Sequence, residues 1–180
     1  MEPPTENHDV AVGTFASHVE AESAIKQLHH AGVDLERLSI AGKDYHTEEH
    51  AVGYYNTGDR MKYWGAIGAF WGGMWGVLIG SGLFWLPGIG PLVVAGPLVG
   101  AIVGGLENAV VSGAMGALGG AIYSIGIPKD SIVQYESTLG EGKFLVIYHG
   151  PADEVAKARE ILAQTAALTV DHHINREQAT

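Results

Sequence analysis

The sequence contains no cysteine, and this absence removes two kinds of chemistry at once. No disulfide can stabilise the fold, and no thiolate is available as a nucleophile or metal ligand. Basic residues are scarce too, because 10 Lys and Arg stand against 20 Asp and Glu, giving a formal net charge of −10. Nucleic-acid binding needs a basic surface, so we expect no nucleic-acid partner. The acidic balance also argues against adsorption to anionic lipid through surface charge alone.

Charge is almost missing from the middle of the chain. Residues 63–128 include a single charged side chain, Glu107, and 18 of the 26 glycines. This contrast predicts an apolar glycine-rich insert within an acidic domain. We therefore expect one discontinuous domain formed by residues 9–62 and 127–174, an insert at 63–126, and polar tails at 1–8 and 175–180.

The insert has the length and composition of a helical hairpin. Trp64–Leu86 is a stretch of 23 residues without charge, and as a helix it would reach roughly 34 Å, enough to cross a bilayer core of about 30 Å. Trp64 and Trp85 stand near its ends, where membrane spans often place aromatic side chains. A second helix is expected over Pro97–Gly126, and Pro87–Pro91 is a turn signal between the two.

Small residues recur every fourth position in both expected helices. Residues four apart share a helix face, so each helix would carry a stripe that lets another helix approach closely, as in a glycine zipper. The pattern predicts self-association into a homo-oligomer. The stripes comprise Gly68, Gly72, Gly76 and Gly80, and then Gly100, Gly104, Asn108, Ser112, Gly116, Gly120 and Ser124.

The environment of this hairpin stays open at the sequence level. The connecting turn has no ionisable side chain, so it fits a hairpin that dips into a bilayer as well as hairpins buried together in a soluble closed assembly. A flexible linker is disfavoured, because linkers are polar and this segment is rich in Trp, Leu, Ile and Val. Glu107 and the neighbouring Asn108 would be buried polar groups, either as a contact between helices or as the lining of a pore. Exposure of Glu107 at the end of a shorter helix is the third alternative.

The flanking residues predict a ferredoxin-like α+β fold, built from two β-α-β units and interrupted by the hairpin. In the first unit Val10 and Val12 share a strand face, Ser17 and Glu20 form a capping box, and the helix ends at Gly32. Its inward residues are Ala21, Ala24, Ile25 and Leu28, followed by a strand with Leu38 and Ile40. After the insert we expect a helix with Ile132, Tyr135 and Leu139, a strand at 144–148, a helix with Val155, Ala158, Ile161 and Leu162, and a strand with Leu168 and Val170.

Both flanking halves must lie on one side of any membrane, because neither has enough apolar surface to fold alone. Arg60 and Lys62 before the insert and Lys129 after it place the domain in the cytoplasm by the positive-inside rule. Met1–Glu6 is acidic and polar, so it does not resemble a signal peptide. The expected location is the inner, cytoplasmic membrane, with membrane lipid as a partner; a soluble cytoplasmic assembly is the alternative.

Several segments resemble a bacterial family of general-stress, heat-induced-type membrane proteins of unknown function. The resemblance covers roughly residues 10–170 and is most specific between Gly53 and Pro97. It implies an association with stress and with the membrane, and it implies no reaction. The segments are Gly53–Lys62, Trp64-Gly65, Gly68–Gly73, Pro87–Pro91, Ala95–Val99 and Ser124–Asp130.

Motifs for catalysis are weak. His46, Glu49 and His50 match the H-x-x-E-H zinc pattern, but Gly53 soon interrupts any helix there, so we interpret this segment as a solvated loop. An adventitious or regulatory metal site and a metal-dependent hydrolase are the weaker alternatives for these three residues. The pairs His29-His30 and His172-His173 are expected to be ordinary surface histidines. We expect no cofactor and no catalytic residue. The sequence therefore favours a non-enzymatic, stress-associated membrane protein that self-assembles through its hairpin; a pore or ion-leak oligomer with Glu107 facing the lumen and a soluble closed homo-oligomer are the alternatives.

Overall fold

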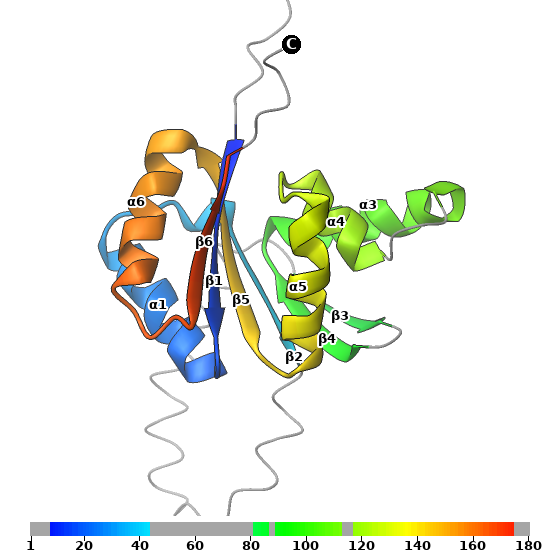
Figure 1. Cartoon of the computed structure of the whole chain (residues 1–180), viewed down its shortest axis with the longest axis horizontal. Helices are drawn as coiled ribbons and strands as arrows, with labels where there is room; N and C mark the ends of the chain where they lie inside the picture. Colours follow the sequence, from blue (N-terminus) through cyan, green and yellow to red (C-terminus); the bar gives the residue numbers. More distant parts are fainter. Residues whose placement is uncertain (1–7, 44–80, 87–88, 113–116, 175–180) are drawn as a thin grey trace, which may run out of the picture.

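The computed structural model describes residues 8–43, 81–86, 89–112 and 117–174, with the backbone alone for residues 43, 81–86, 105–112 and 117. Over this part of the chain the fold is mixed α+β, as predicted, with helices on both faces of one antiparallel sheet (Figure 1). The strands are β1 (His8–Phe15), β2 (Leu38–Lys43), β3 (Ser81–Leu86), β4 (Gly90–Ala95), β5 (Phe144–Pro151) and β6 (Thr169–His173). The helices are α1 (His18–His30), the short 3-10 helix η1 (Leu35–Arg37), α3 (Pro97–Ser112), α4 (Ala117–Ser124), α5 (Lys129–Gly140) and α6 (Ala152–Ala163).

The sheet joins the two flanking halves of the chain. Its strand order is β3-β4-β2-β5-β1-β6, so β5 lies between β1 and β2, and β1 lies between β5 and β6. Each β-α-β unit thus straddles a strand of the other unit, and all pairings are antiparallel. Strands from the two flanking halves therefore pair directly with one another in one sheet.

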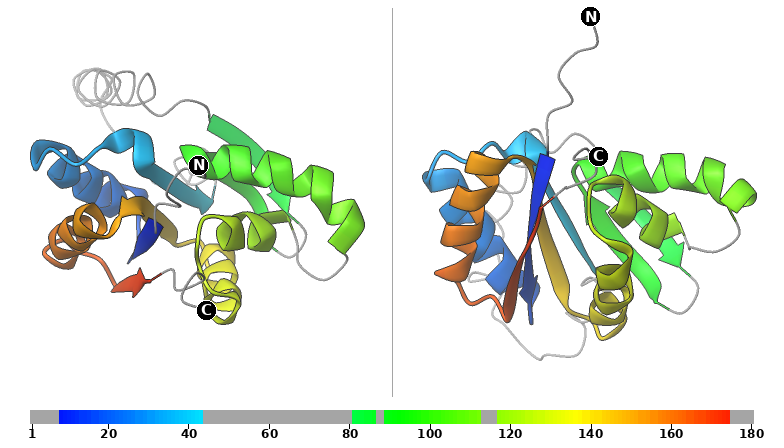
Figure 2. Two further views of the ribbon diagram at one scale, coloured as in Figure 1. Left: turned by 90° about the horizontal axis from the view of Figure 1, so that it is seen from above. Right: turned by 45° about the horizontal axis from the view of Figure 1, so that its top comes forward.

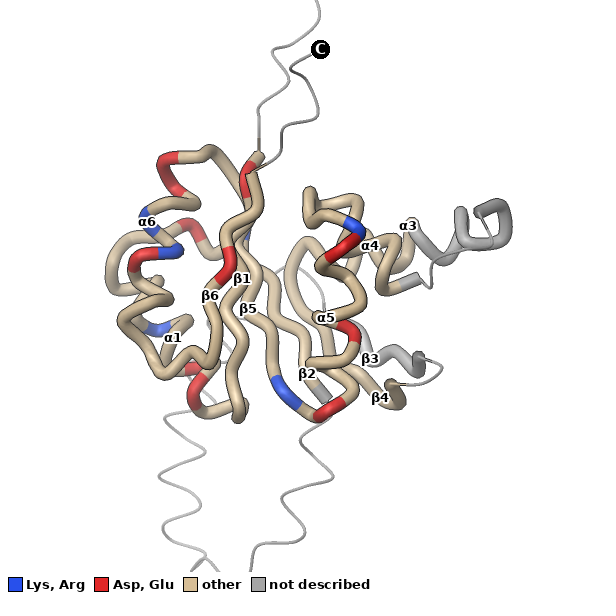
Figure 3. The backbone as a smooth tube through the Cα atoms, viewed as in Figure 1, with Lys and Arg blue, Asp and Glu red and all other residues tan. Residues whose placement is uncertain are grey.

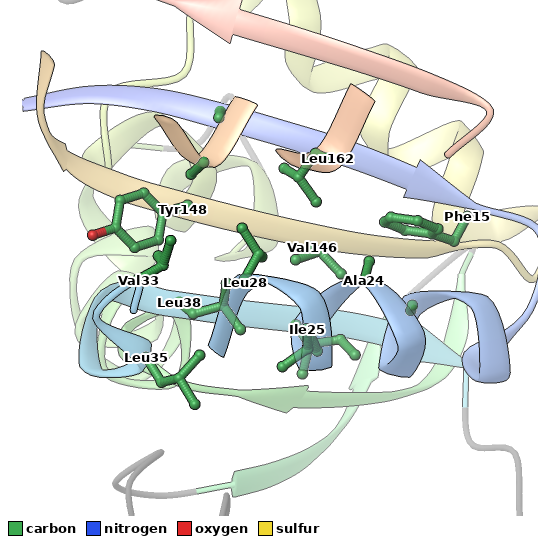
Figure 4. Close-up of a cluster of buried hydrophobic side chains, with 14 of the residues drawn as sticks. Phe15, Ala24, Ile25, Leu28, Val33, Leu35, Leu38, Val146, Tyr148 and Leu162 are labelled. Carbon is green, nitrogen blue, oxygen red and sulfur yellow. The ribbon is translucent and has the colours of Figure 1, made fainter. Parts of the chain in front are cut away.

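Helices α1 and α6 cover one face of the sheet (Figure 2). The apolar cluster beneath them is close-packed, with Phe15, Ile25 and Leu28 fully buried between strands and helices (Figure 4). The inward positions predicted from periodicity are confirmed for both helices, except that Ile161 is only partly buried. Leu168, expected in the last strand, precedes β6 and is 53 % exposed.

The ends of α1 follow from local chemistry. The Ser17 hydroxyl accepts the Glu20 N–H at 3.3 Å, and the Glu20 carboxylate accepts the Ala16 N–H at 3.1 Å, one residue earlier than in a standard capping box. At the other end Gly32 has φ +74°, a conformation that ends helices and favours glycine. The predicted start and stop of this helix are confirmed.

Helices α3, α4 and α5 cover the other face of the sheet. Val10 and Val12 of β1 and Ile147 of β5 are fully buried there, in one cluster with residues of all three helices. The predicted inward residues of α5 are confirmed, with Ile132, Tyr135 and Leu139 buried. The helices of the expected insert contribute these buried residues to the cluster: Leu98, Ile102, Leu118, Ala121 and Ile122.

The expected helix over Trp64–Leu86 is wrong at its C-terminal end. Residues 81–86 are strand β3, and the turn signal at Pro87–Pro91 joins β3 to β4, with Leu86 opposite Gly90. Aromatic and β-branched side chains favour strands, and a short uncharged run does not distinguish a buried strand from a helix. Residues 64–80 lie outside the described residues.

The second expected helix, Pro97–Gly126, is divided into α3 and α4, and residues 113–116 lie outside the described residues. The expected boundary between the insert and the second flanking half, at residue 126, does not separate two packing units, because α4 before it and α5 after it belong to one buried cluster. Strand β4 pairs with β2, from Ile40 opposite Ala95 to Lys43 opposite Leu92, and α3 and α4 pack on the same sheet. Residues 90–126 therefore contribute to the core that the insert was expected to leave alone.

Candidate functional site

The layer formed by α3 and α4 is the candidate functional site, because it includes part of the predicted small-residue stripe. A β-carbon built on Gly100 or Gly120 would meet no described heavy atom within 4 Å outside its own helix. Gly119, which the four-residue pattern does not mark, is the packed glycine: its β-carbon position lies 3.2 Å from Ile132 Cγ2 and 3.0 Å from Glu136 Oε1. Stripe positions in this layer thus leave space for another surface, whereas contact with α5 uses a different glycine.

The remaining stripe residues are less completely described. Gly104 is half-buried on α3, and Ser112 is the last residue of α3, with its backbone alone described. The Ser124 hydroxyl donates to the Ala121 carbonyl oxygen at 2.7 Å within its own helix. Gly68, Gly72, Gly76, Gly80 and Gly116 lie outside the described residues.

The outer surface of this layer has no charged side chain in residues 89–104 and 118–127. Val103 of α3 is 47 % exposed and Tyr123 of α4 is 40 % exposed. The nearby cation Lys129 opens α5, and its Nζ lies 5.1 Å from the centroid of the Tyr123 ring. By contrast, α1 and α6 carry acidic and basic side chains along their length, as Figure 3 shows.

Close backbone contact fixes where α3 begins. Gly96 has φ +87°, and a β-carbon there would overlap the Leu38 carbonyl oxygen of β2. The neighbouring Ser39, which is 1 % exposed, accepts the Leu98 N–H at 3.1 Å through its hydroxyl. This bond satisfies one of the amide groups that a helix leaves unpaired at its N-terminus. The layer is therefore attached to the sheet by polar contacts as well as apolar ones.

A polar cluster lies between α5 and the sheet. The buried hydroxyl of Tyr135 donates to Asp171 Oδ2 at 2.9 Å and lies 2.7 Å from His173 Nε2, with both partners on β6. Burial raises the pKa of Tyr135, and the hydrogen bond to Asp171 raises it further. Burial lowers the pKa of His173, although the Asp171 charge acts in the opposite direction. The phenol therefore acts here as a hydrogen-bond donor, which no sequence pattern marked.

A pair of histidines, His8 and His149, lies on the same face of the sheet as this polar cluster. The rings of His8 and His149 are perpendicular, with centroids 6.3 Å apart, and His149 Nδ1 is buried without a hydrogen-bond partner among the described residues. Burial lowers the pKa of His149, and the charge of a protonated His8 lowers it further, while a hydrogen bond to the Arg37 backbone acts to raise it. The neutral imidazole is thus favoured at this position.

The interpretation of His172-His173 as surface histidines is wrong. His173 contacts Tyr135, and His172 Nε2 lies 3.0 Å from Asp9 Oδ2 on the opposite face of the sheet, with both histidines partly buried. Because side chains alternate along a strand, Asp171 and His173 lie on one face of the sheet and His172 lies on the other. The residues that they contact depend on the register of β6 with β1 and on the position of α5, which the sequence does not reveal. His29 and His30 are exposed at the end of α1, as predicted.

The other predicted site residues lie outside the described residues or have only their backbone described. His46, Glu49, His50 and Trp64 lie outside the described residues, whereas Trp85 is in β3 and Glu107 and Asn108 are in α3, with their backbone alone described. Among the described residues, no group of three or more acidic or histidine side chains could hold a metal ion. In the same part of the chain, every helix is too short or too polar for a membrane span.

Neither family models, curated proteins nor solved structures give a match to this chain.

Proposed function

We propose that this protein has a non-catalytic role and self-assembles through its apolar glycine-rich insert, residues 63–126, with a ferredoxin-like domain as its support. In this proposal copies of the chain associate at the cytoplasmic membrane, where the small-residue stripes allow close contact between helices. The resemblance at Gly53–Pro97 supports a stress-associated role there.

The observation that carries this proposal is the outer surface of α3 and α4, where the described side chains carry no charge. Exposed apolar side chains such as Val103 and Tyr123 lie beside Gly100 and Gly120, whose β-carbon positions meet open space. Exposed apolar surface is a common feature of interaction sites where it is extensive. A second copy is the favoured occupant, because contact between uncharged layers keeps the acidic domains of a chain with net charge −10 apart.

The strand order supports the ferredoxin-like part of the proposal. Within the sheet, β6-β1-β5-β2 is the arrangement that two interleaved β-α-β units give, and α1 and α6 lie together on one face. Strands β3 and β4 extend this unit beyond β2, and α3, α4 and α5 cover the face that the two crossover helices leave open.

One observation favours a second arrangement, a soluble closed homo-oligomer. Leu98 and Ile102 of α3 are fully buried against the sheet, so part of the uncharged layer is already covered by its own chain. Only its outer side then needs shelter, and sister copies can provide that shelter in water. The charge-free length of residues 63–80 supports the membrane arrangement instead.

The test is to place a charge on each of two valines with equal exposure. Val103→Glu adds a carboxylate to the outer side of α3, and the matched control Val19→Glu adds one to α1, where Val19 is 49 % exposed compared with 47 % for Val103. A carboxylate buried without a partner at an interface weakens association by at least about tenfold. We therefore expect the first variant to shift towards the single-chain mass and the second to retain the wild-type mass.

Particle mass is measured for the full chain in mild detergent and in plain buffer, with bound lipid quantified in the same samples. An assembly in both media that loses mass only in Val103→Glu supports the proposal, and its lipid content separates the two arrangements. A wild-type single chain in both media, or an oligomer that neither substitution changes, contradicts self-assembly through this layer.

A further inference from the structure

Three histidines lie at one end of the sheet, on the face that α5 covers. Val10 of β1 is opposite His149 of β5 on one side and His173 of β6 on the other, so these residues form a row across three neighbouring strands. Val10 faces the side of the sheet that α5 covers, and His8, two residues away on β1, shares that face. In Figure 1 the strands that carry this row, β6, β1 and β5, lie side by side between α6 and α5.

Protonation of His149 would be unfavourable for a structural reason. Its Nδ1 atom is buried and has no acceptor among the described residues, so a proton added there would stay unpaired in the folded chain. The added charge would also lie near His8, whose ring is 6.3 Å away, and near the guanidinium of Arg37. The charges of both neighbours oppose protonation of His149.

His173 connects the row to α5 itself. Its Nε2 lies 2.7 Å from the Tyr135 hydroxyl, and the same hydroxyl donates to Asp171 Oδ2. Since the hydroxyl proton is directed to Asp171, His173 acts as the donor in its own contact with the tyrosine oxygen. This three-residue contact is a polar link between α5 and β6 in an otherwise apolar interface.

The other charged groups around the row are few. Asp171 is the acidic group that faces it from β6, whereas Asp9 and His172 bond to each other on the opposite face of the sheet. On α5, Lys129 and Asp130 are exposed in the first turn, and Glu136 lies next to Gly119 of α4. The described side chains of α3 and α4 carry no charge. Among the described residues, Asp171 is therefore the carboxylate that faces His149 and His173 in this row.

We propose that protonation of His149 and His173 in mildly acidic solution releases α5 from the sheet and exposes the apolar face beneath it. The sign follows from linkage: both histidines have a pKa below the ordinary value when α5 is packed. The packed state is therefore fully stable above the ordinary histidine pKa of about 6.5, and it loses stability as pH falls below that value. This inference concerns a single chain and does not depend on self-association.

Hydrogen exchange of the full chain, read by mass spectrometry and corrected for intrinsic rates, tests this release at about pH 7.5 and about pH 5.5. For each histidine that gains its proton only after α5 opens, the opening equilibrium rises by up to about tenfold per pH unit. Peptides from α5 should lose protection at the lower pH, while those from α1 and α6 retain it. Unchanged protection of α5 would overturn the proposal.

Substitutions test whether His149 and His173 cause the loss of α5 protection. The double variant His149→Gln and His173→Gln should retain α5 protection at the lower pH, and the control His29→Gln with His30→Gln, on the exposed end of α1, should behave as wild type. An equal loss of α5 protection in both variants refutes the assignment. NMR titration of the wild-type imidazole signals needs no variant: the loss of protection must follow the titration of His149 or His173, and a midpoint shared only with exposed histidines refutes it as well.

Discussion

Gly42 shows how strongly one position of the sheet restricts its side chain. It lies in β2, where a β-carbon would overlap the ring of Phe144, including the ring carbon closest to the backbone. The ring cannot move away by rotating its far end alone, because Phe144 is buried in the cluster under α1 and α6. The position therefore requires glycine for reasons of space.

Gly42→Ala should lower the free energy of unfolding by about 1–3 kcal/mol, the usual range for overpacking a core. The matched control is Gly140→Ala at the end of α5, where a β-carbon would meet nothing within 4 Å among the described residues, and where alanine should be neutral or slightly stabilising. Urea denaturation followed by circular dichroism measures both. Equal stability of the two variants would show that the Phe144 ring moves aside without lowering the free energy of unfolding.

At the scale of elements, the start of α3 depends on a residue far away in the sequence. The Ser39 hydroxyl that accepts the Leu98 N–H belongs to β2, 59 residues earlier. Ser39→Ala leaves this amide without its partner in a buried place. We expect a loss of about 1 kcal/mol in unfolding free energy, within the range of about 0.5–2 kcal/mol for helix caps.

The control for this prediction is Ser124→Ala on α4. Its hydroxyl bonds a carbonyl within its own helix and is exposed, so its removal should change stability by less than about 0.5 kcal/mol. Hydrogen exchange of α3 peptides identifies the location of the effect. A Ser39→Ala variant with native stability and native α3 protection would mean that water replaces the hydroxyl.

Elements with strong periodicity could be predicted from the sequence, and uncharged ones could not. The spacing of Ala21, Ile25 and Leu28 identifies α1, because charged and apolar residues alternate around that helix. Residues 81–95 have no charge to mark an exposed side, so a strand and a buried helix look alike there, and β3 and β4 were missed. The Tyr135–His173 contact depends on strand register and helix placement, which arise only when distant segments pack.

At the scale of the whole molecule, buried residues of β4, α3 and α4 belong to the core of the domain. Leu98 and Ile102 of α3 share one buried cluster with Val10 and Ile147, which come from the two flanking halves. Both faces of the sheet are thus covered, and the cover of the second face comes largely from the expected insert. Loss of this layer should therefore affect the sheet as well.

Leu98→Ala should destabilise the entire fold by about 2–5 kcal/mol, because it removes a buried side chain from a packed interior. Val103→Ala, on the exposed side of the same helix, should change stability by less than about 0.5 kcal/mol. Exchange of β1 and β5 amides reports on the sheet itself. If Leu98→Ala loosens α3 while these strands keep wild-type protection, the layer is an independent unit and the shared core is refuted.

Strand β2 has a neighbour on each side, β5 on one and β4 on the other. If β4 moved away together with the helices that follow it, the main-chain amides and carbonyls of Ile40–Lys43 would form an unpaired, exposed sheet edge. Such an edge can recruit strands from other molecules and polymerise through the backbone. Any rearrangement that mobilises α3 and α4 without causing fibril-like aggregation must therefore leave β4 in its place.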